Sequence, residues 1–286
     1  MTFTECPRWR DGRLYFSDFY TGRVLSVGLD GSAETLVQIA GIPAGLGFLP
    51  DGRLIFAEKR ERKIWRREPD GSLVLHADLS GLVSNYLNEM IVDADGRAWA
   101  GNYGFDLDGG APIVPTVLMC VEPDGSARVV TDGLGFPNGE VLSADGTTLI
   151  VAETFGNRLS AFEVTPNGLS QRRDWAKFGD SPTTADVMEV MGSADVVPDG
   201  ICMDIEGAVW VADITHKRVI RVAEGGAILA DLKTGEFMPF ACMLGGEDGK
   251  TLFVCVAESF VAEETLAKRT GAIWWMRVDV GHAGTP

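Results

Sequence analysis

Four oxygen-bearing side chains lie at nearly the same distance from a turn that repeats along this sequence. The turn is an acidic residue followed by glycine, and counting seven residues back from it reaches Asn88, Asn138 and Asp199, while Glu5 is one residue off the count. Carboxylate and amide oxygens within a few ångströms of one another form a site for a hard divalent cation that keeps some of its waters. A cation of this kind activates water for attack on a carbonyl group. The spacing therefore predicts a site for a divalent cation, provided that the fold brings these segments together.

A simpler interpretation exists for two of the four residues. Asn138 and Asp199 each precede a glycine, and Asn-Gly and Asp-Gly are common turn dipeptides. Glu5 and Asn88 are in no such dipeptide, yet they follow the same count. If Glu5 and Asp199 met in a dry channel without a cation, they would repel and one would stay protonated. We therefore interpret the four residues as a cation site.

The elements that must position these residues repeat six times. Successive turns are separated by 40, 44, 50, 61 and 42 residues, which is close to the length of a β-propeller blade. Short alternating stretches rich in β-branched and aromatic residues follow each turn, and these indicate antiparallel meanders. The turns are Asp11-Gly12, Asp51-Gly52, Asp95-Gly96, Asp145-Gly146, Glu206-Gly207 and Asp248-Gly249. The repeat predicts an all-β fold, a six-bladed β-propeller with a central channel, as a single domain over residues 1–286.

A propeller would place the repeated position where the innermost strand of each blade begins. Side chains from this position should then point into one end of the central channel. In the other two blades the same count reaches Ala44 and Ala241, so only four blades would contribute oxygen atoms.

The composition excludes some classes of partner. The chain has 41 acidic and 25 basic residues and a net charge of −16, which argues against nucleic-acid binding. No apolar run has the length of a membrane span, and the first ten residues lack a signal-peptide pattern, so we expect a cytoplasmic protein with no membrane partner. The five cysteines are scattered and form no CxxC, which indicates buried thiols in a reducing compartment. The sequence does not indicate an oligomeric state.

Four segments of the chain resemble motifs of the senescence-marker-protein-30/gluconolactonase family, which includes regucalcin. Glu5–Trp9 is similar to its E-G-P-x-W opening, and Asn88–Asp93 with Gly96–Gly101 is similar to its N-D-x-x-x-D…G-R-x-x-x-G segment. Pro137–Gly139 and Pro198–Ile201 are similar to its third and fourth motifs. The motifs occur in the family order and span essentially the whole chain.

The resemblance implies a six-bladed propeller that holds one divalent metal ion and hydrolyses lactones or related esters. Carried over by motif, Glu5, Asn138 and Asp199 would be the metal ligands. Asp199 would also be the general base, and Asn88 would contact the substrate or a water on the metal. Ca²⁺ is the favoured ion, with Zn²⁺, Mg²⁺, Mn²⁺ and Fe²⁺ as alternatives. The expected partner is a small-molecule lactone or ester.

The chain departs from the family motifs at three positions near the expected site. Cys6 stands where the family has glycine, and Glu89 stands where it has aspartate. Tyr86 stands where an arginine associated with sugar lactones is common. This departure weakens the expectation of a sugar-lactone substrate and favours a more apolar lactone or ester. Glu58 and Tyr103 are, with Tyr86, Asn88 and Glu89, further candidates for contact with the substrate. Whether Cys6 reaches the metal is left open.

Two other functions and two irregular segments stay open at this point. A propeller without enzymatic activity would bind a protein or small ligand and use the cation as a brace, and a lyase or isomerase would use the same ion. Four converging polar residues favour the enzyme, because a brace needs no open coordination position. Residues 179–197 and 263–269 interrupt the strand pattern. Each is a candidate lid, although for the second a surface loop is favoured.

Overall fold

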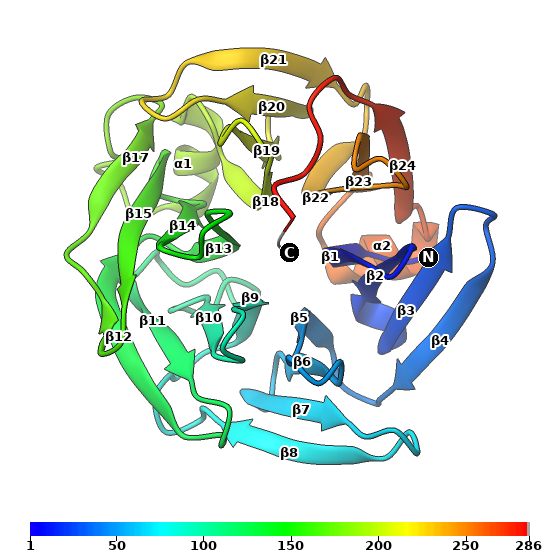
Figure 1. Cartoon of the computed structure of the whole chain (residues 1–286). Helices are drawn as coiled ribbons and strands as arrows, with labels where there is room; N and C mark the ends of the chain where they lie inside the picture. The colour runs from blue at the N-terminus through cyan, green and yellow to red at the C-terminus, as the bar shows by residue number, and fades with distance from the viewer. Residues whose placement is uncertain (285–286) are drawn as a thin grey trace.

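The computed structural model of the chain describes residues 1–284, whose strands form six antiparallel sheets around a central axis (Figure 1). The six-bladed β-propeller predicted from the repeat is therefore confirmed. The first blade contains β1 (Thr4–Arg10), β2 (Arg13–Asp18), β3 (Arg23–Gly28) and β4 (Ala33–Gln38). The second contains β5 (Pro43–Phe48), β6 (Leu54–Glu58), β7 (Lys63–Arg67) and β8 (Leu73–Asp78). The third contains β9 (Leu87–Val92), β10 (Ala98–Asn102), β11 (Thr116–Val121) and β12 (Ala127–Leu134).

Of the last three blades, the fourth and sixth depart from the four-stranded pattern. The fourth contains β13 (Pro137–Leu142), β14 (Thr148–Glu153), β15 (Arg158–Thr165), β16 (Gly168–Leu169) and β17 (Arg173–Lys177). The fifth contains β18 (Pro198–Met203), β19 (Val209–Asp213), β20 (Arg218–Val222) and β21 (Ile228–Lys233). The sixth contains β22 (Met238–Gly245), β23 (Thr251–Ala257) and β24 (Ala272–Arg277). Three short helices interrupt the strands, namely η1 (Phe19–Thr21), α1 (Val187–Ser193) and α2 (Ala262–Lys268). None of the helices in residues 1–284 has the length and apolar character needed to cross a membrane.

The ring closes where the first blade meets the last. The innermost strand β1 packs beside both β5 of the second blade and β22 of the sixth. The Thr4 hydroxyl also donates a hydrogen bond of 3.0 Å to the carbonyl of Ala272 in β24. Contacts between neighbouring inner strands continue around the whole ring, so every blade covers the faces of two others.

The six acidic-Gly turns each join the first and second strands of a blade. Gly96, for example, has φ 84°, a conformation that glycine adopts without steric cost. Each turn follows the end of an inner strand, so the residues that begin those strands lie at the opposite end of the channel. The turn used for counting is thus remote from the site that it locates.

Each inner strand is also irregular near its beginning. In β13 the pairing moves from Pro137–Glu153 to Glu140–Val151, so two residues, Asn138 and Gly139, lie opposite one. The same irregularity in β18 contains Asp199, and the one in β9 contains Asn88. A β-bulge redirects a side chain relative to its strand. The positions predicted to carry chemistry therefore lie where the inner strands depart from regular pairing.

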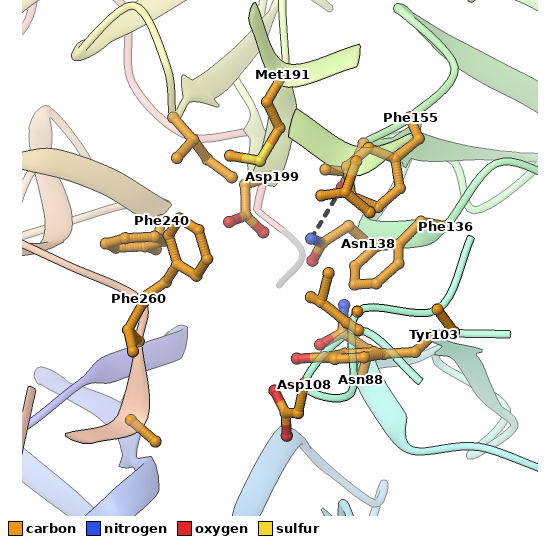
Figure 2. Close-up of a pocket in the computed structure, with 18 of the residues that line it drawn as sticks. Asn88, Tyr103, Asp108, Phe136, Asn138, Phe155, Met191, Asp199, Phe240 and Phe260 are labelled. Carbon is orange, nitrogen blue, oxygen red and sulfur yellow. Dashed lines mark hydrogen bonds between the residues drawn. The ribbon is translucent and has the colours of Figure 1, made fainter. Parts of the chain in front are cut away.

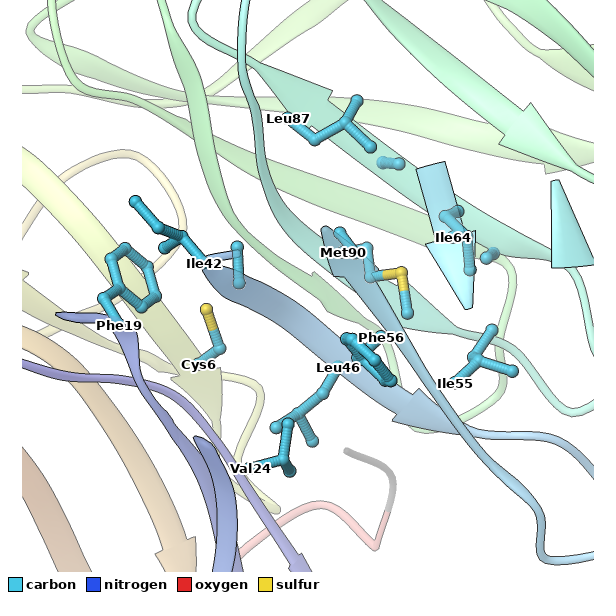
Figure 3. Packing of buried hydrophobic residues seen from close by; sticks show 14 of the residues in the cluster. Cys6, Phe19, Val24, Ile42, Leu46, Ile55, Phe56, Ile64, Leu87 and Met90 are labelled. Atoms are coloured by element: carbon cyan, nitrogen blue, oxygen red, sulfur yellow. The ribbon is translucent and has the colours of Figure 1, made fainter. Parts of the chain in front are cut away.

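Apolar side chains fill the spaces between blades and fix the inner strands. Between the first three blades, Val24, Leu46, Phe56 and Met90 are fully buried and pack together (Figure 3). Burying a side chain of this size contributes about 1.5–3 kcal/mol. Cys6 lies in the same cluster, and all five cysteines are buried free thiols.

Candidate active site

The four side chains identified by the repeat line one cavity at one end of the central channel. Glu5, Asn88, Asn138 and Asp199 come from β1, β9, β13 and β18, and each is only 5–6% exposed. Figure 2 shows the Asp199 carboxyl group and the Asn138 amide pointing into the same space, with Asn88 nearby. The fold thus brings together residues that are up to 194 positions apart in the chain.

The Asn138 amide is held in place by Thr154, which is itself hydrogen-bonded to the next blade. Its Nδ2 donates to the Thr154 hydroxyl at 3.0 Å, and that hydroxyl donates to the carbonyl of Pro198 at 2.9 Å. Pro198 directly precedes Asp199, so Thr154 links the two blades that carry Asn138 and Asp199. Because Nδ2 is engaged in this way, the amide oxygen is the atom of Asn138 available to a cation.

The Glu5 carboxylate is fixed by the irregular part of β1. Its Oε2 accepts a hydrogen bond of 2.9 Å from the backbone N–H of Cys6, which has φ 55°. A non-glycine residue rarely adopts this conformation. The strained backbone at Cys6 is therefore part of what positions Glu5.

The acidic groups at the floor of the cavity are buried and repel one another, which disfavours their charged forms. Burial, followed by repulsion from Glu89, raises the pKa of Glu5 to about 8. Burial, followed by repulsion from Glu5, raises the pKa of Asp199 well above its usual range. A divalent cation between the two carboxylates would remove the repulsion and stabilise their charged forms.

The donor set fits a hard cation. Residues 1–284 contain no group of three or more His, Cys, Asp or Glu side chains arranged to hold a metal ion. The candidate set has two carboxylates, from Glu5 and Asp199, and draws its other oxygen from the Asn138 amide. Oxygen donors of these types suit Ca²⁺, Mg²⁺ or Mn²⁺ better than a soft metal. Asn88 adds a buried Nδ2 that has no hydrogen-bond partner within the described residues, so it is free to donate to a ligand.

A second ring of side chains lines the cavity beyond the first. Each of these residues directly follows the second strand of its blade, in five of the six blades. The backbone N–H of each donates a hydrogen bond to the backbone carbonyl of the residue just before the inner strand. They are Phe19, Lys59, Tyr103, Thr154 and Ile214. Of these, the sequence analysis identified only Tyr103. The signal was present, because four of the five stand eight residues after the acidic residue of a repeated turn.

Lys59 is the basic residue of this second ring. It is 4% exposed, and its ammonium group donates a hydrogen bond to the Tyr103 hydroxyl. The nitrogen lies 4.3 Å from the centre of the Tyr103 ring, 5.2 Å from that of Phe19 and 5.6 Å from that of Tyr86. Burial lowers the pKa of Lys59 to about 8.

Three predicted substrate contacts, and Cys6, lie outside the cavity lining. Glu58 accepts a 2.8 Å hydrogen bond from the backbone N–H of Ile42, an anchoring role that acidic residues repeat at the same strand end in other blades. Glu89 is buried beside Arg8, at 3.5 Å, and Cys6 packs in the core between blades. Tyr86 packs behind Tyr103, with ring centres 5.8 Å apart. Tyr103 and Asn88 do line the cavity.

The walls of the cavity are mainly apolar. The cavity has a volume of about 820 Å³ and is lined by Phe3, Phe136, Phe155, Phe240 and Phe260 among others (Figure 2). Both irregular segments border it, through residues 185–188 and Met191 around α1 and through residues 262–263 of α2. The second segment, for which a surface loop was favoured, therefore also contributes to the mouth.

The fold and this site together define a six-bladed propeller with an oxygen-rich centre at the floor of a deep apolar cavity. The chain belongs to the SMP-30/gluconolactonase/LRE-like family, whose profile matches residues 3–258.

Named relatives agree with this assignment. The chain is 27% identical to a 6-deoxy-6-sulfogluconolactonase of Pseudomonas putida, over 99% of this chain and 93% of that protein. A solved gluconolactonase structure from Xanthomonas campestris is 27% identical, with a TM-score of 0.71 over 90% of this chain and 84% of that one. A calcium-binding regucalcin from Agrobacterium tumefaciens shares the fold, with a TM-score of 0.80 at 18% identity over 100% and 93%. Relatives named as lactonases support an enzyme that hydrolyses lactones.

Proposed function

We propose that this protein is a metal-dependent hydrolase that opens lactones or related esters in the cavity at the end of its central channel. The observation that carries the proposal is the convergence of Glu5, Asn138 and Asp199 at the floor of a buried cavity with apolar walls. The lactonase relatives support the reaction, and the oxygen donors support a hard divalent cation. Ca²⁺ is favoured because a structural neighbour is described as calcium-binding. Zn²⁺, Mg²⁺, Mn²⁺ and Fe²⁺ are the alternatives.

In this proposal Glu5, Asn138 and Asp199 hold the cation. When bound, the cation polarises the lactone carbonyl and lowers the pKa of water from near 16 towards about 7. Asp199 accepts a proton from the attacking water, and the hydroxide adds to the carbonyl carbon. Asn88 donates a hydrogen bond to the substrate from its otherwise unpartnered Nδ2. The dry surroundings strengthen each of these polar contacts.

The apolar walls define the substrates that the cavity would favour. Small-molecule sites of about 300–1,000 Å³ bury most of a ligand, and this cavity falls in that range. Phe136, Phe155, Phe240 and Met191 would contact a hydrocarbon substituent on the ring. Tyr86 replaces the arginine expected for sugar lactones and packs behind the cavity wall. We therefore propose lactones with alkyl or aryl substituents, rather than polyhydroxylated ones, as the substrate class.

Acid release from a panel of lactones, with elemental analysis of the same purified protein, tests this function. We expect one divalent ion per chain and kcat/KM values that rise with the length of an alkyl substituent. A chelator should abolish the activity and the ion should restore it. Asp199→Ala should lower kcat/KM by at least about 10²-fold. The exposed Asp132 on β12 provides a matched control, Asp132→Ala, which should keep full activity.

Two results would contradict the proposal. Protein that contains the ion but releases acid from none of the lactones would favour a binding propeller, or a lyase or isomerase. Full activity in Asp199→Ala would eliminate the assigned base.

A further inference from the structure

Lys59 is a cationic group enclosed in the cavity for which the reaction outlined above has no role. It lines the same cavity as Glu5 and Asn88, yet it is 4% exposed. Its place directly after β6 fixes its backbone, because its N–H donates to Ile42 at 2.9 Å and its carbonyl accepts from Leu87 at 3.0 Å. Lysine is seldom fully buried unless it is paired. The cost of burying this side chain therefore calls for a physical reason.

The neighbours of the Lys59 ammonium leave hydrogen-bonding capacity unused. An ammonium group has three donors, and one of them is used by the Tyr103 hydroxyl. The aromatic rings around the nitrogen attract its charge through their faces but accept no conventional hydrogen bond. No carboxylate in residues 1–284 forms an ion pair with it. The remaining donors are available to a molecule in the cavity.

The reaction needs a proton donor that the cavity floor does not provide. Ring opening leaves a negative charge on the former ring oxygen, and Asp199 is already assigned as the acceptor of the water proton. Among the other groups that line the cavity, burial raises the pKa of Tyr20 to about 12 and that of Tyr103 well above its usual range. Both phenols are therefore weak acids. Glu5 is assigned to the cation, so Lys59, with a pKa lowered to about 8, is left as a stronger acid than either phenol.

We propose that Lys59 donates the proton to the leaving oxygen during ring opening, with Tyr103 as its positioning residue. This inference rests on the proposed function. The hydroxide adds to the carbonyl carbon, and the acyl C–O bond of the ring then breaks with its electron pair on the ring oxygen. That oxygen takes a proton from the Lys59 ammonium, which becomes a neutral amine. Lys59 recovers a proton from solvent and Asp199 releases one, so that the net reaction consumes one water.

The nature of the leaving group decides how much this donor matters. An aliphatic alkoxide has a conjugate acid about as weak as water, with a pKa near 16, and it leaves slowly without a proton. A phenolate, with a pKa of about 10, leaves readily without one. General acid catalysis contributes about 10²–10⁴-fold where it is needed. The effect of removing Lys59 should therefore depend on the leaving group of the substrate.

The pH dependence follows from the protonated form being the active one. Burial favours deprotonation of Lys59, and so does the charge of Arg60, whereas negative charges on Asp108 and Glu5 oppose it. Cys6 lies close to Lys59, but burial raises the pKa of its thiol, which keeps it uncharged. The ammonium is present below about pH 8 and is lost as the pH rises through that value. Turnover of aliphatic lactones should therefore fall as the pH rises through the pKa of Lys59 in the metal-bound enzyme, and turnover of aryl esters should lack this decline.

The test compares Lys59→Met and Lys59→Arg with wild type on an aliphatic δ-lactone and on dihydrocoumarin, whose leaving group is a phenolate. We expect Lys59→Met to lower kcat/KM by about 10²–10⁴-fold on the aliphatic lactone and by less than about tenfold on dihydrocoumarin. Lys59→Arg keeps the charge, but arginine does not give up a proton near neutral pH, so the same selective loss is expected. Tyr103→Phe should cause a smaller loss with the same selectivity.

Retained turnover of dihydrocoumarin shows that a variant is folded and binds its ion. Lys233→Met is the matched control, because it removes a lysine side chain that is 62% exposed on β21. It should leave kcat/KM unchanged on both substrates. Equal losses on the two substrates, or recovery of the aliphatic activity in Lys59→Arg, would overturn the proton-donor role. Recovery in Lys59→Arg would indicate that the side chain acts on the substrate through its positive charge and not by giving up a proton. Wild type that hydrolyses neither substrate would overturn the proposed function as well, so the two failures are distinguishable.

Discussion

Thr154 affects the proposed metal site without being one of its ligands. Its hydroxyl accepts from Asn138 and donates to the carbonyl of Pro198, so it orients the amide oxygen towards the cavity. Groups that orient metal ligands typically contribute 10–100-fold to metal affinity. We expect Thr154→Val to weaken binding of the divalent ion by about that factor, as measured by isothermal titration calorimetry.

The same substitution at an exposed strand position controls for the change in residue type. Thr35 lies exposed on β4, so Thr35→Val should leave the affinity unchanged. Unaltered metal binding in Thr154→Val would show that Asn138 needs no such support or is not a ligand.

Residue type and spacing were sufficient to predict that Glu5, Asn88, Asn138 and Asp199 share one end of the channel, because the turn count measures distance along a repeated unit. It was not sufficient for Glu58 or Lys59. These two are adjacent in the chain, yet Glu58 anchors backbone while Lys59 lines the cavity. Successive side chains at a strand end point in different directions. Only the structure decides which of them reaches the cavity.

At the scale of elements, the irregular inner strands bring the candidate ligands of adjacent blades close together. Gly139 in β13 packs so tightly that a Cβ atom there would lie 2.5 Å from the backbone nitrogen of Ile201 and 2.6 Å from the carbonyl oxygen of Asp199. Gly45 and Gly200 make similarly close approaches at the corresponding place. A regular strand with larger residues would push the blades, and with them the ligands, apart.

Gly139→Ala should therefore lower the free energy of unfolding by about 1–3 kcal/mol, the usual cost of forcing extra volume into a packed interior. It should also weaken metal binding, since the strain falls on the backbone of Asp199. Urea denaturation followed by metal titration measures both effects. Gly192→Ala in α1 is the control, because a Cβ atom there meets nothing within 4 Å. Equal stabilities of the two variants would contradict this account of the packing.

At the scale of the whole molecule, burial of like charges at one end of the ring links stability to pH and to metal. The folded-state pKa of Glu5, about 8, lies above its ordinary value of 4.5, so the folded chain binds the proton more tightly than the unfolded chain. This contribution to the stability of metal-free protein is complete below about pH 4.5 and is lost as the pH rises through about 8. In the proposed metal-bound form, the divalent ion would replace the proton.

We therefore expect the ion to raise the Tm more at pH 8 than at pH 5, as measured by differential scanning fluorimetry. At an ion concentration 100 times Kd, the gain corresponds to about 2.7 kcal/mol. Glu5→Gln removes the charge with little change in shape. Its metal-free form should be more stable than wild type at pH 8, and its response to the ion should be small. A Tm shift of equal size at both pH values would contradict the linkage.

The sequence alone determined the architecture, because six turns at nearly constant spacing require six similar units that bury their faces only against one another. It also determined which residues share a position in those units, and so predicted the oxygen-rich floor of the cavity. The tertiary structure decided what surrounds that floor. Lys59, Thr154 and the helices α1 and α2 reach the cavity through directions set by bulges, strand ends and the packing of neighbouring blades. Those directions depend on contacts between segments far apart in the chain, and no local pattern records them.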